Sequence, residues 1–257
     1  EFYKAGGFQD TRLPAADVAP FKEASTPNFL AAQVLTKLMV ARARQLDAEG
    51  QVGPAMDTVL RTAWVASFYM GEEQMLITRL IGIACLHISL RAMEDILRNP
   101  AEHAELARSA GSQLFRIEQR LAGIGSSLRM ESAVGRAQLP GMLAGMKKQV
   151  EAATPEQIEA ELAKMPPEQR AMATELMGME VEDLESGHDK LWEAVLESIA
   201  RPYWEREAMD SAWFDQRTSN PLYKIAMPNF LEAATREEVV RARLRACQAA
   251  CARRMGS

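Results

Sequence analysis

Aromatic side chains, cysteines and long apolar runs are all scarce in this sequence of 257 residues. Strands favour aromatic and β-branched side chains, so an aromatic content of 6% with only short β-branched runs argues against a strand-rich fold. Three cysteines are too few for the framework of a small disulfide-stabilised domain. The most apolar run, 80–90, is about half as long as the roughly 20 residues of a membrane-spanning helix. We expect 80–90 to be the most buried helix of a soluble protein, in contact with at least two others.

The residues that are abundant favour helices. Apolar residues make up 47% of the chain and charged residues 25%, which are ordinary values for a globular protein. Ala, Leu, Met, Glu, Gln and Arg are frequent, and these residues lose least on entering a helix. We predict an all-α fold with at least about 60% helix, well above the usual third. About nine helices are expected, in an irregular multi-helix bundle.

Proline, glycine and capping residues divide the chain into helical segments. Thr154 and Gln157 have the spacing of a capping box, and Pro155 suits the first helical position. The glycines and Pro140 of 123–146 instead predict short helices or an irregular crossing. The expected helices are 28–49, 54–70, 72–98, 100–121, 155–165, 168–186, 188–209 and 228–254, with a short turn of helix opening at Asn220-Pro221.

The same signals suggest how the chain is organised. Residues 1–26 contain glycines and prolines without periodicity, so we expect an extended N-terminal arm. The remainder, 27–257, is expected to be a single helical domain. Its lobes, at about 27–122 and 154–254, would be joined by the glycine- and methionine-rich segment 123–146. Short connections imply that sequential helices pack mostly antiparallel.

Two sequence patterns concern the first and last helices. In 28–49, apolar residues at helical spacing form one stripe that we expect to face the core. The stripe consists of Leu30, Val34, Leu35, Leu38 and Leu46. In addition, the sequence Pro-Asn-Phe-Leu at 27–30 recurs at 228–231. Either two helices share a common start pattern, or they have equivalent roles and pack as a pair. Equivalent roles would bury both Phe29 and Phe230 and place both asparagines at the helix start.

Charge is unevenly distributed. The net charge is −5, and 151–210 contains 16 acidic and five basic residues. This acidic segment is either a partner surface or a solvated set of helix faces. The C-terminal helix is basic, but it lacks interleaved aromatics, and Arg241, Arg243 and Arg245 spread around it. We therefore expect no nucleic-acid partner.

Residues 43–63 resemble the helical hairpin of tetratricopeptide-type proteins. The residues that carry the resemblance are Ala43, Leu46, Gly50, Ala55 and Val59. It covers one unit of about 30 residues, the aromatic position of the first helix is missing, and a solenoid needs about three units. The resemblance therefore implies tetratricopeptide-like antiparallel hairpins inside an irregular helical fold. The chain as a whole resembles bacterial all-helical proteins carried behind an N-terminal anchor. Because the sequence begins with Glu1, an exported or periplasmic protein whose signal or anchor was removed is one expectation.

Histidine offers one motif with metal-binding spacing. Glu185 and His188 have the E-x-x-H spacing of ferritin-like di-iron bundles. Such sites need two of these motifs and two further glutamates. Neither His87 nor His103 has a glutamate three residues before it, and Gly187 indicates a helix boundary beside His188. We expect no metal site.

The remaining histidine and cysteines are predicted to be structural. Cys85 and His87 point to opposite sides of a helix and cannot share a ligand. We expect His87 to be buried and neutral, with one hydrogen bond to a neighbouring helix and with Glu94 on the same face. Cys247 and Cys251 continue a core stripe and are expected to be buried reduced thiols.

No catalytic residue, cofactor-binding residue, metal ligand or cofactor is predicted. The sequence has no phosphate-binding loop, nucleophile elbow, zinc-protease motif or dinucleotide-binding turn. Methionine can bind Cu(I), but it more often fills irregular cores or adaptable grooves. The close methionine pairs are Met142 with Met146 and Met177 with Met179. The candidate aromatic anchors are Trp64, Trp192, Trp204 and Trp213.

These observations leave two hypotheses of function. The first is a non-enzymatic interaction or scaffold protein that presents helical surfaces to a protein partner. The second is a small-molecule or lipid-binding helical protein, possibly an enzyme, with a pocket between helices lined by Met and Trp. A filled body with an exposed apolar groove would favour the first, and a continuous apolar cavity the second.

Overall fold

The computed structural model describes residues 29–72, 74–98, 104–207, 209, 211–218 and 221–255. Among these residues 86% are helical and no strand occurs, which confirms the predicted all-α fold. Nine helices in this part of the chain have ten or more residues. The elements are α1 (Phe29–Ala48), α2 (Val52–Phe68), α3 (Leu76–Arg98), α4 (Ala104–Arg120), α5 (Ile124–Ala152), α6 (Pro155–Lys164), α7 (Pro167–Met177), α8 (Val181–Ala200), the 3-10 turn η1 (Tyr203–Glu205), α9 (Ser211–Asp215) and α10 (Pro221–Met255).

The chain divides into two compact units. The first comprises Glu1–Met130 together with Ala233–Ser257, and the second comprises Glu131–Glu232. Both α5 and α10 continue from one unit into the other, and the C-terminal part of α10 belongs with α1–α4. The expected N-terminal arm, 1–26, lies outside the described residues.

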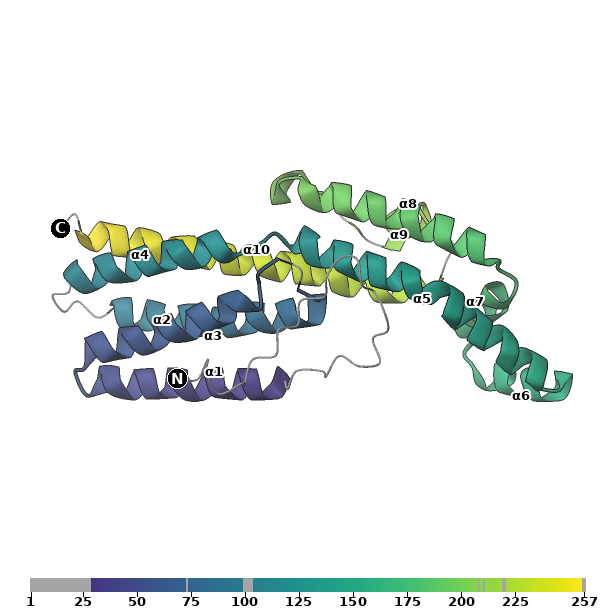
Figure 1. Cartoon of the computed structure of the whole chain (residues 1–257), viewed down its shortest axis with the longest axis horizontal. Coiled ribbons are helices and arrows are strands. Elements are labelled where there is room, and N and C mark those ends of the chain that lie inside the picture. The colour runs from purple at the N-terminus through teal and green to yellow at the C-terminus, as the bar shows by residue number, and fades with distance from the viewer. Residues whose placement is uncertain are drawn as a thin grey trace. The chain divides into compact units, whose positions relative to one another are not determined.

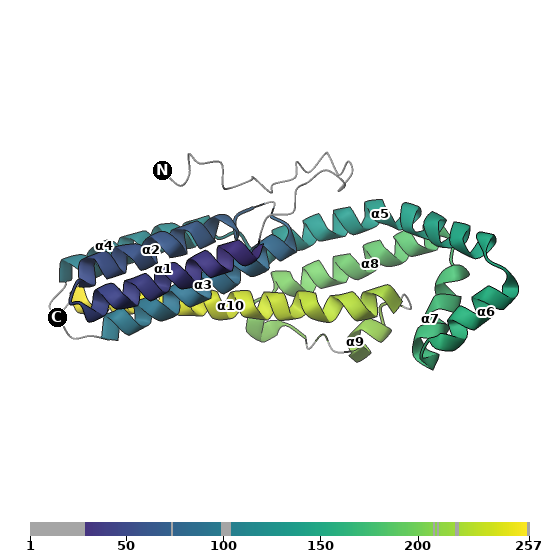
Figure 2. The same ribbon diagram turned by 90° about the horizontal axis from the view of Figure 1, so that it is seen from below.

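In the first unit, α1 and α2 form an antiparallel hairpin (Figure 2). The chain turns at Gly50, whose φ of 76° lies in the left-handed region that glycine adopts without steric cost. Ala43 and Ala55 are completely buried, so small side chains allow the two helices to approach closely. As predicted, Pro54 lies in the first turn of α2, where its missing N–H costs nothing.

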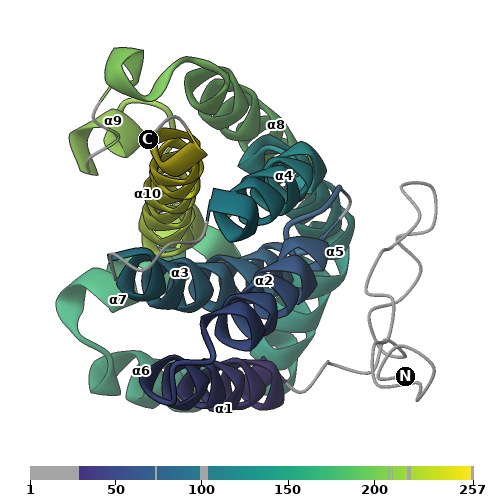
Figure 3. The same cartoon turned by 90° about the vertical axis from the view of Figure 1, so that its left-hand side faces the viewer.

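Helix α3 is the centre of the first unit. It packs against both α1 and α2, and its apolar stretch is buried as predicted (Figure 3). Among the described residues it is long and apolar enough to cross a membrane, but 67% of its most apolar window is buried inside the protein. This burial is typical of a core helix. At Gly82 the residues after α2 come so close that a Cβ atom would lie 2.7 Å from Met70 Cγ and 2.8 Å from Tyr69 Cβ, so any other residue would force them to move.

Helix α5 differs from the prediction (Figure 1). Residues 124–152 form the single helix α5, and not the short helices expected for 123–146. A glycine inside a helix costs about 1 kcal/mol, which tertiary packing can offset. Leu139 and Leu143 are buried one turn apart and pack with Leu184 of α8, and this packing stabilises α5 in spite of its glycines. The predicted capping box of Thr154 and Gln157 is confirmed at the start of α6.

The boundary between α7 and α8 also differs from the prediction. The chain breaks at Gly178, whereas Gly187 lies inside α8. Leu184, Leu191 and Val195 are buried at spacings that continue through Gly187, so their packing maintains the helix there. Helix α8 then ends at Ala200 instead of near 209. The residue before Pro202 is extended, as the proline ring requires.

The last helix is longer than predicted. Helix α10 begins at Pro221 and continues through 228–231, so the second Pro-Asn-Phe-Leu sequence does not start a helix. The first copy does coincide with the start of α1, which means that the two copies occupy different helical positions. In the first unit α3 lies between α1 and α10 (Figure 3). The side chains of Phe29 and Phe230 lie outside the described residues, and their burial stays a prediction.

Most of the α1 residues that were predicted to face the core are exposed. Leu30 is 75% exposed and Leu38 62% exposed, and Val34 and Leu35 are also exposed. The residues that pack inward are Thr36, Val40, Ala43 and Leu46. Helix α1 is apolar on two sides, so periodicity alone did not distinguish the buried side from the exposed one.

Candidate functional site

A groove of about 1120 Å³ crosses the helices of the first unit. Helix α2 forms its floor, with α1 on one side and α4 on the other, as the end-on view shows (Figure 3). Its lining includes Leu35 and Met39 of α1, Trp64 of α2, and Ser112, Gln113 and Arg116 of α4.

Trp64, on the floor of the groove, belongs to an aromatic and cationic cluster. Trp64, which is 36% exposed, meets Phe68 edge to face with ring centroids 5.8 Å apart. The Arg120 guanidinium lies 4.7 Å from the Trp64 centroid and 4.1 Å from that of Phe68. Cation–π contacts of this kind contribute about 0.5–1 kcal/mol at exposed sites. They hold Trp64 in one orientation while part of its ring stays accessible.

The inner end of the groove reaches three polar side chains between α1, α2 and α3. They belong to Thr36, Tyr69 and Cys85. Burial raises the pKa of the Cys85 thiol, although a hydrogen bond with Thr36 lowers it. Burial, and then the nearby Cys85, raise the pKa of Tyr69. Both groups therefore stay protonated at neutral pH, and a protonated thiol is not the nucleophilic form of cysteine.

The surface beside the groove is unusually apolar. On α1, Leu30, Val34 and Leu38 lie one turn apart, all more than half exposed, next to the groove residue Leu35. On α4, Phe115 is 58% exposed beside the groove residue Arg116. Exposed apolar side chains that gather at a concave surface mark binding sites more often than isolated ones do.

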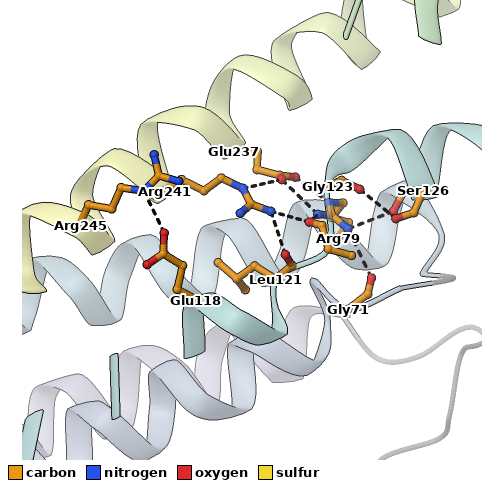
Figure 4. Close-up of polar contacts among 11 residues, drawn as sticks. Gly71, Arg79, Glu118, Leu121, Gly123, Ser126, Glu237, Arg241 and Arg245 are labelled. Carbon is orange, nitrogen blue, oxygen red and sulfur yellow. Dashed lines mark hydrogen bonds and ion pairs between the residues drawn. The ribbon is translucent and has the colours of Figure 1, made fainter. Parts of the chain in front are cut away.

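A buried ionic cluster lies elsewhere in the first unit (Figure 4). Arg79 of α3 is fully buried, and its Nε donates to Glu237 Oε2 of α10 at 2.6 Å. Glu237 Oε1 also accepts from Arg241 Nε at 2.9 Å. Both arginines donate to the carbonyl oxygen of Ala122, and Arg79 also reaches that of Gly71. The cluster joins α10 to the α4–α5 connection. Its charged side chains bond to one another and to backbone carbonyl oxygens.

Two further arginines of α10 contact neighbouring helices. Arg243 donates to His87 Nε2 at 2.9 Å and pairs with Glu94 at 3.0 Å. A hydrogen bond between His87 and a neighbouring helix is therefore confirmed, but the predicted burial of His87 is wrong, because its side chain is only partly buried. Burial, and then the Arg243 charge, lower the pKa of His87 and favour its neutral form. Arg245 pairs with Glu118 of α4 at 2.8 Å.

His188 is buried in the second unit and has a structural contact. Its Nε2 donates to the carbonyl oxygen of Ser132 on α5 at 2.9 Å. Glu185 and Asp189, its neighbours on α8, both face Arg136. The part of the chain that the structure describes contains no group of three His, Cys, Asp or Glu side chains able to hold a metal.

The stability of the second unit is expected to fall at acidic pH because of His188. Burial lowers its pKa below the value of about 6.5 in the unfolded chain. Below pH 6.5 the unfolded chain therefore binds a proton that the folded chain resists, and stability is lost as pH falls through this range. Thermal unfolding measured between pH 7.5 and 5.5 should show a smaller loss of Tm for His188→Gln than for the wild type. An equal loss of Tm in these two proteins would contradict this account.

The other predicted residues are dispersed. Cys247 and Cys251 are buried reduced thiols, as expected, and burial followed by the Glu94 charge raises the pKa of Cys247 to about 12. Trp64 is the tryptophan that lines the groove. Trp192 and Trp213 are buried, and Trp204 is 83% exposed. The methionine that lines this groove is Met39, which belongs to neither of the two predicted pairs.

No protein-family model matches the chain, and neither a curated protein nor a solved structure matches it. The function must therefore be inferred from the site itself. Sequence reasoning named Trp64 but missed the α4 wall of the groove. The signal for that wall is weak, because Ser109, Ser112 and Gln113 have the composition of any solvated helix face.

Proposed function

We propose that this chain is a non-enzymatic interaction protein that binds a protein partner in the groove formed by α1, α2 and α4. The observation that carries the proposal is the exposed apolar lining of the groove, where Leu35 is 37% and Trp64 36% exposed, on a hairpin that also exposes Leu30, Val34 and Leu38. A helix that is apolar on two opposite sides is usually covered on both. Helix α1 packs on α2 and α3, and a partner in the groove that also extended around α1 would cover its exposed stripe.

The side chains in the groove suit a protein interface. Trp, Tyr and Arg are the residues that most often dominate binding energy when they lie in a desolvated pocket. Trp64, Tyr69 and Arg116 all line the groove. Trp64 is already oriented by Arg120, so binding would cost little of its side-chain entropy.

The hairpin of α1 and α2 is consistent with this proposal. We interpret it as a single tetratricopeptide-type unit, on the basis of the buried positions Ala43, Leu46, Ala55 and Val59. Its outer surface provides both the apolar side of α1 and the Trp64 floor. The hairpin would thus be the rigid support on which the groove is built.

A second candidate function is the binding of a small apolar ligand or lipid. The observation that favours it is the volume of about 1120 Å³, because ligand pockets usually measure about 300–1,000 Å³. The polar groups of Thr36, Tyr69 and Cys85 at the inner end could orient such a ligand. Exposed Leu30 and Leu38 have no role in this alternative, since they lie outside the groove.

Site-specific photo-cross-linking in the native host separates these two functions. A photoreactive phenylalanine at Ser112 lies in the groove, and one at Arg91 lies on the exposed side of α3. The proposal predicts a protein adduct from position 112 and none from position 91. An adduct of less than about 1 kDa at position 112 would support the ligand alternative. No adduct at position 112, or equal protein adducts at both positions, would contradict partner binding in the groove.

A further inference from the structure

We infer that the segment of the partner that occupies the groove is an amphipathic α-helix with carboxylates along one flank. This inference rests on the proposed function and specifies the partner of the same site. It follows from the different chemistry of the two walls and from the charge left uncompensated in the groove.

Apart from Thr36 at the inner end, the α1 wall of the groove is apolar. It presents Ala32, Leu35 and Met39 toward the groove, and Val65 and Trp64 continue this apolar surface on α2. Met39 has a flexible thioether side chain that adapts to the shape of a partner. The flank of the partner that faces α1 must therefore be apolar.

The α4 wall has the opposite character. Ser109, Ser112, Gln113 and Arg116 line the groove along it. Hydroxyl and amide groups can bond a polar flank of either charge, so the ionic groups decide which charge is favoured.

The uncompensated charge on this wall is positive. Asp57 and Arg61 neutralise each other on the floor, with an ion pair of 2.8 Å. Arg116 has no ion pair or hydrogen bond within the described residues, and Arg120, one turn further along α4, has only its ring contacts there. The acidic Glu105 lies in the first turn of α4, outside the groove lining. A carboxylate opposite Arg116 would gain a charge-assisted contact, whereas a lysine would be repelled.

The arrangement of α1, α2 and α4 around the groove favours a helical segment of the partner. A helix that lies on α2 between α1 and α4 would pack at the usual interaxial distance of about 8–10 Å and fill the groove lengthwise. An extended peptide usually binds by adding a strand to a sheet edge, and the described residues offer no strand. Apolar residues at three- and four-residue spacing would face Leu35 and Trp64, and carboxylates on the adjacent flank would face Arg116.

Two synthetic helical peptides test this inference. Both have the same Leu and Ala face, and they differ only in carrying Glu or Lys along one flank. Fluorescence anisotropy at low salt should show about five- to tenfold tighter binding of the Glu peptide, a preference of the size that one or two exposed charge contacts produce. Added salt should reduce the preference. Arg116→Glu should abolish or reverse it, whereas Arg91→Glu, on the exposed side of α3, should not.

The outcomes distinguish this inference from the proposed function. Equal binding of both peptides, or an equal effect of Arg116→Glu and Arg91→Glu, would overturn the acidic helix. Failure of both peptides while Ser112 still cross-links to a protein would overturn the acidic helix and leave the proposed function intact. Failure of both peptides without any protein adduct at Ser112 would overturn both.

Discussion

Replacing Glu237 by alanine is expected to lower the free energy of unfolding by about 3–5 kcal/mol, the usual cost of removing one partner of a buried ion pair. Glu237 is 3% exposed, and its carboxylate neutralises the fully buried Arg79. Its removal would leave a buried guanidinium without a counterion. Arg241 would lose the same partner, although it would keep its contacts with the carbonyl oxygens of Leu121 and Ala122.

Urea unfolding of matched variants measures this effect. Asp95→Ala removes an exposed carboxylate that pairs with Arg44, and it should cost less than about 1 kcal/mol. Combining Glu237→Leu with Arg79→Met should cost less than Glu237→Ala alone, because the uncompensated charge is removed as well. Equal effects of Glu237→Ala and Asp95→Ala would show that the cluster is hydrated and that its charges are not buried.

Leu86→Ala is expected to cost about 2–5 kcal/mol, the range observed when a large apolar side chain is removed from a packed core. Leu86 is fully buried at the middle of α3, where α1 and α2 both pack. Nearby side chains belong to helices that are fixed on several sides, so they cannot move far enough to fill the cavity.

Ile77→Ala provides the control on the same helix. Ile77 is exposed in the first turn of α3, and its replacement should change the stability by less than about 1 kcal/mol. Thermal unfolding followed by circular dichroism measures both variants. A loss below about 0.5 kcal/mol for Leu86→Ala would mean that α3 is not the core helix.

Local signals in the sequence predicted the elements whose boundaries depend on local chemistry. The capping box at Thr154 and Gln157 and the glycine turn at Gly50 are examples, since each is decided by residues that are neighbours in sequence. The burial of 80–90 was also predictable, because an apolar run of this length has no other place in a helical protein.

Other boundaries depend on packing that local signals do not report. Gly187 and Pro228 lie inside helices, although both residues usually mark helix ends. In α8 the buried residues on either side of Gly187 outweigh the propensity of one glycine. The pair of Arg79 and Glu237 joins residues 158 positions apart, and nothing local to either residue indicates the other.

The candidate site was predictable only in part. Trp64 was predicted as one of four candidate aromatic anchors, and nothing in the sequence distinguished it from the other three. The groove itself arises where α4 lies beside α2 and leaves one side of α1 uncovered, and this arrangement is tertiary. Leu30 and Leu38 were predicted to be buried, and their exposure is the feature that now points to a partner.

Native mass spectrometry of the protein purified from its own host tests the central claim most directly. The account predicts a species heavier than the 28.5 kDa chain by the mass of a second protein. Leu35→Glu, in the groove, should abolish this species, whereas Ile77→Glu, at an exposed apolar position on α3, should leave it intact. Detection of the chain alone, or of the chain with a bound molecule of less than about 1 kDa, would contradict the account.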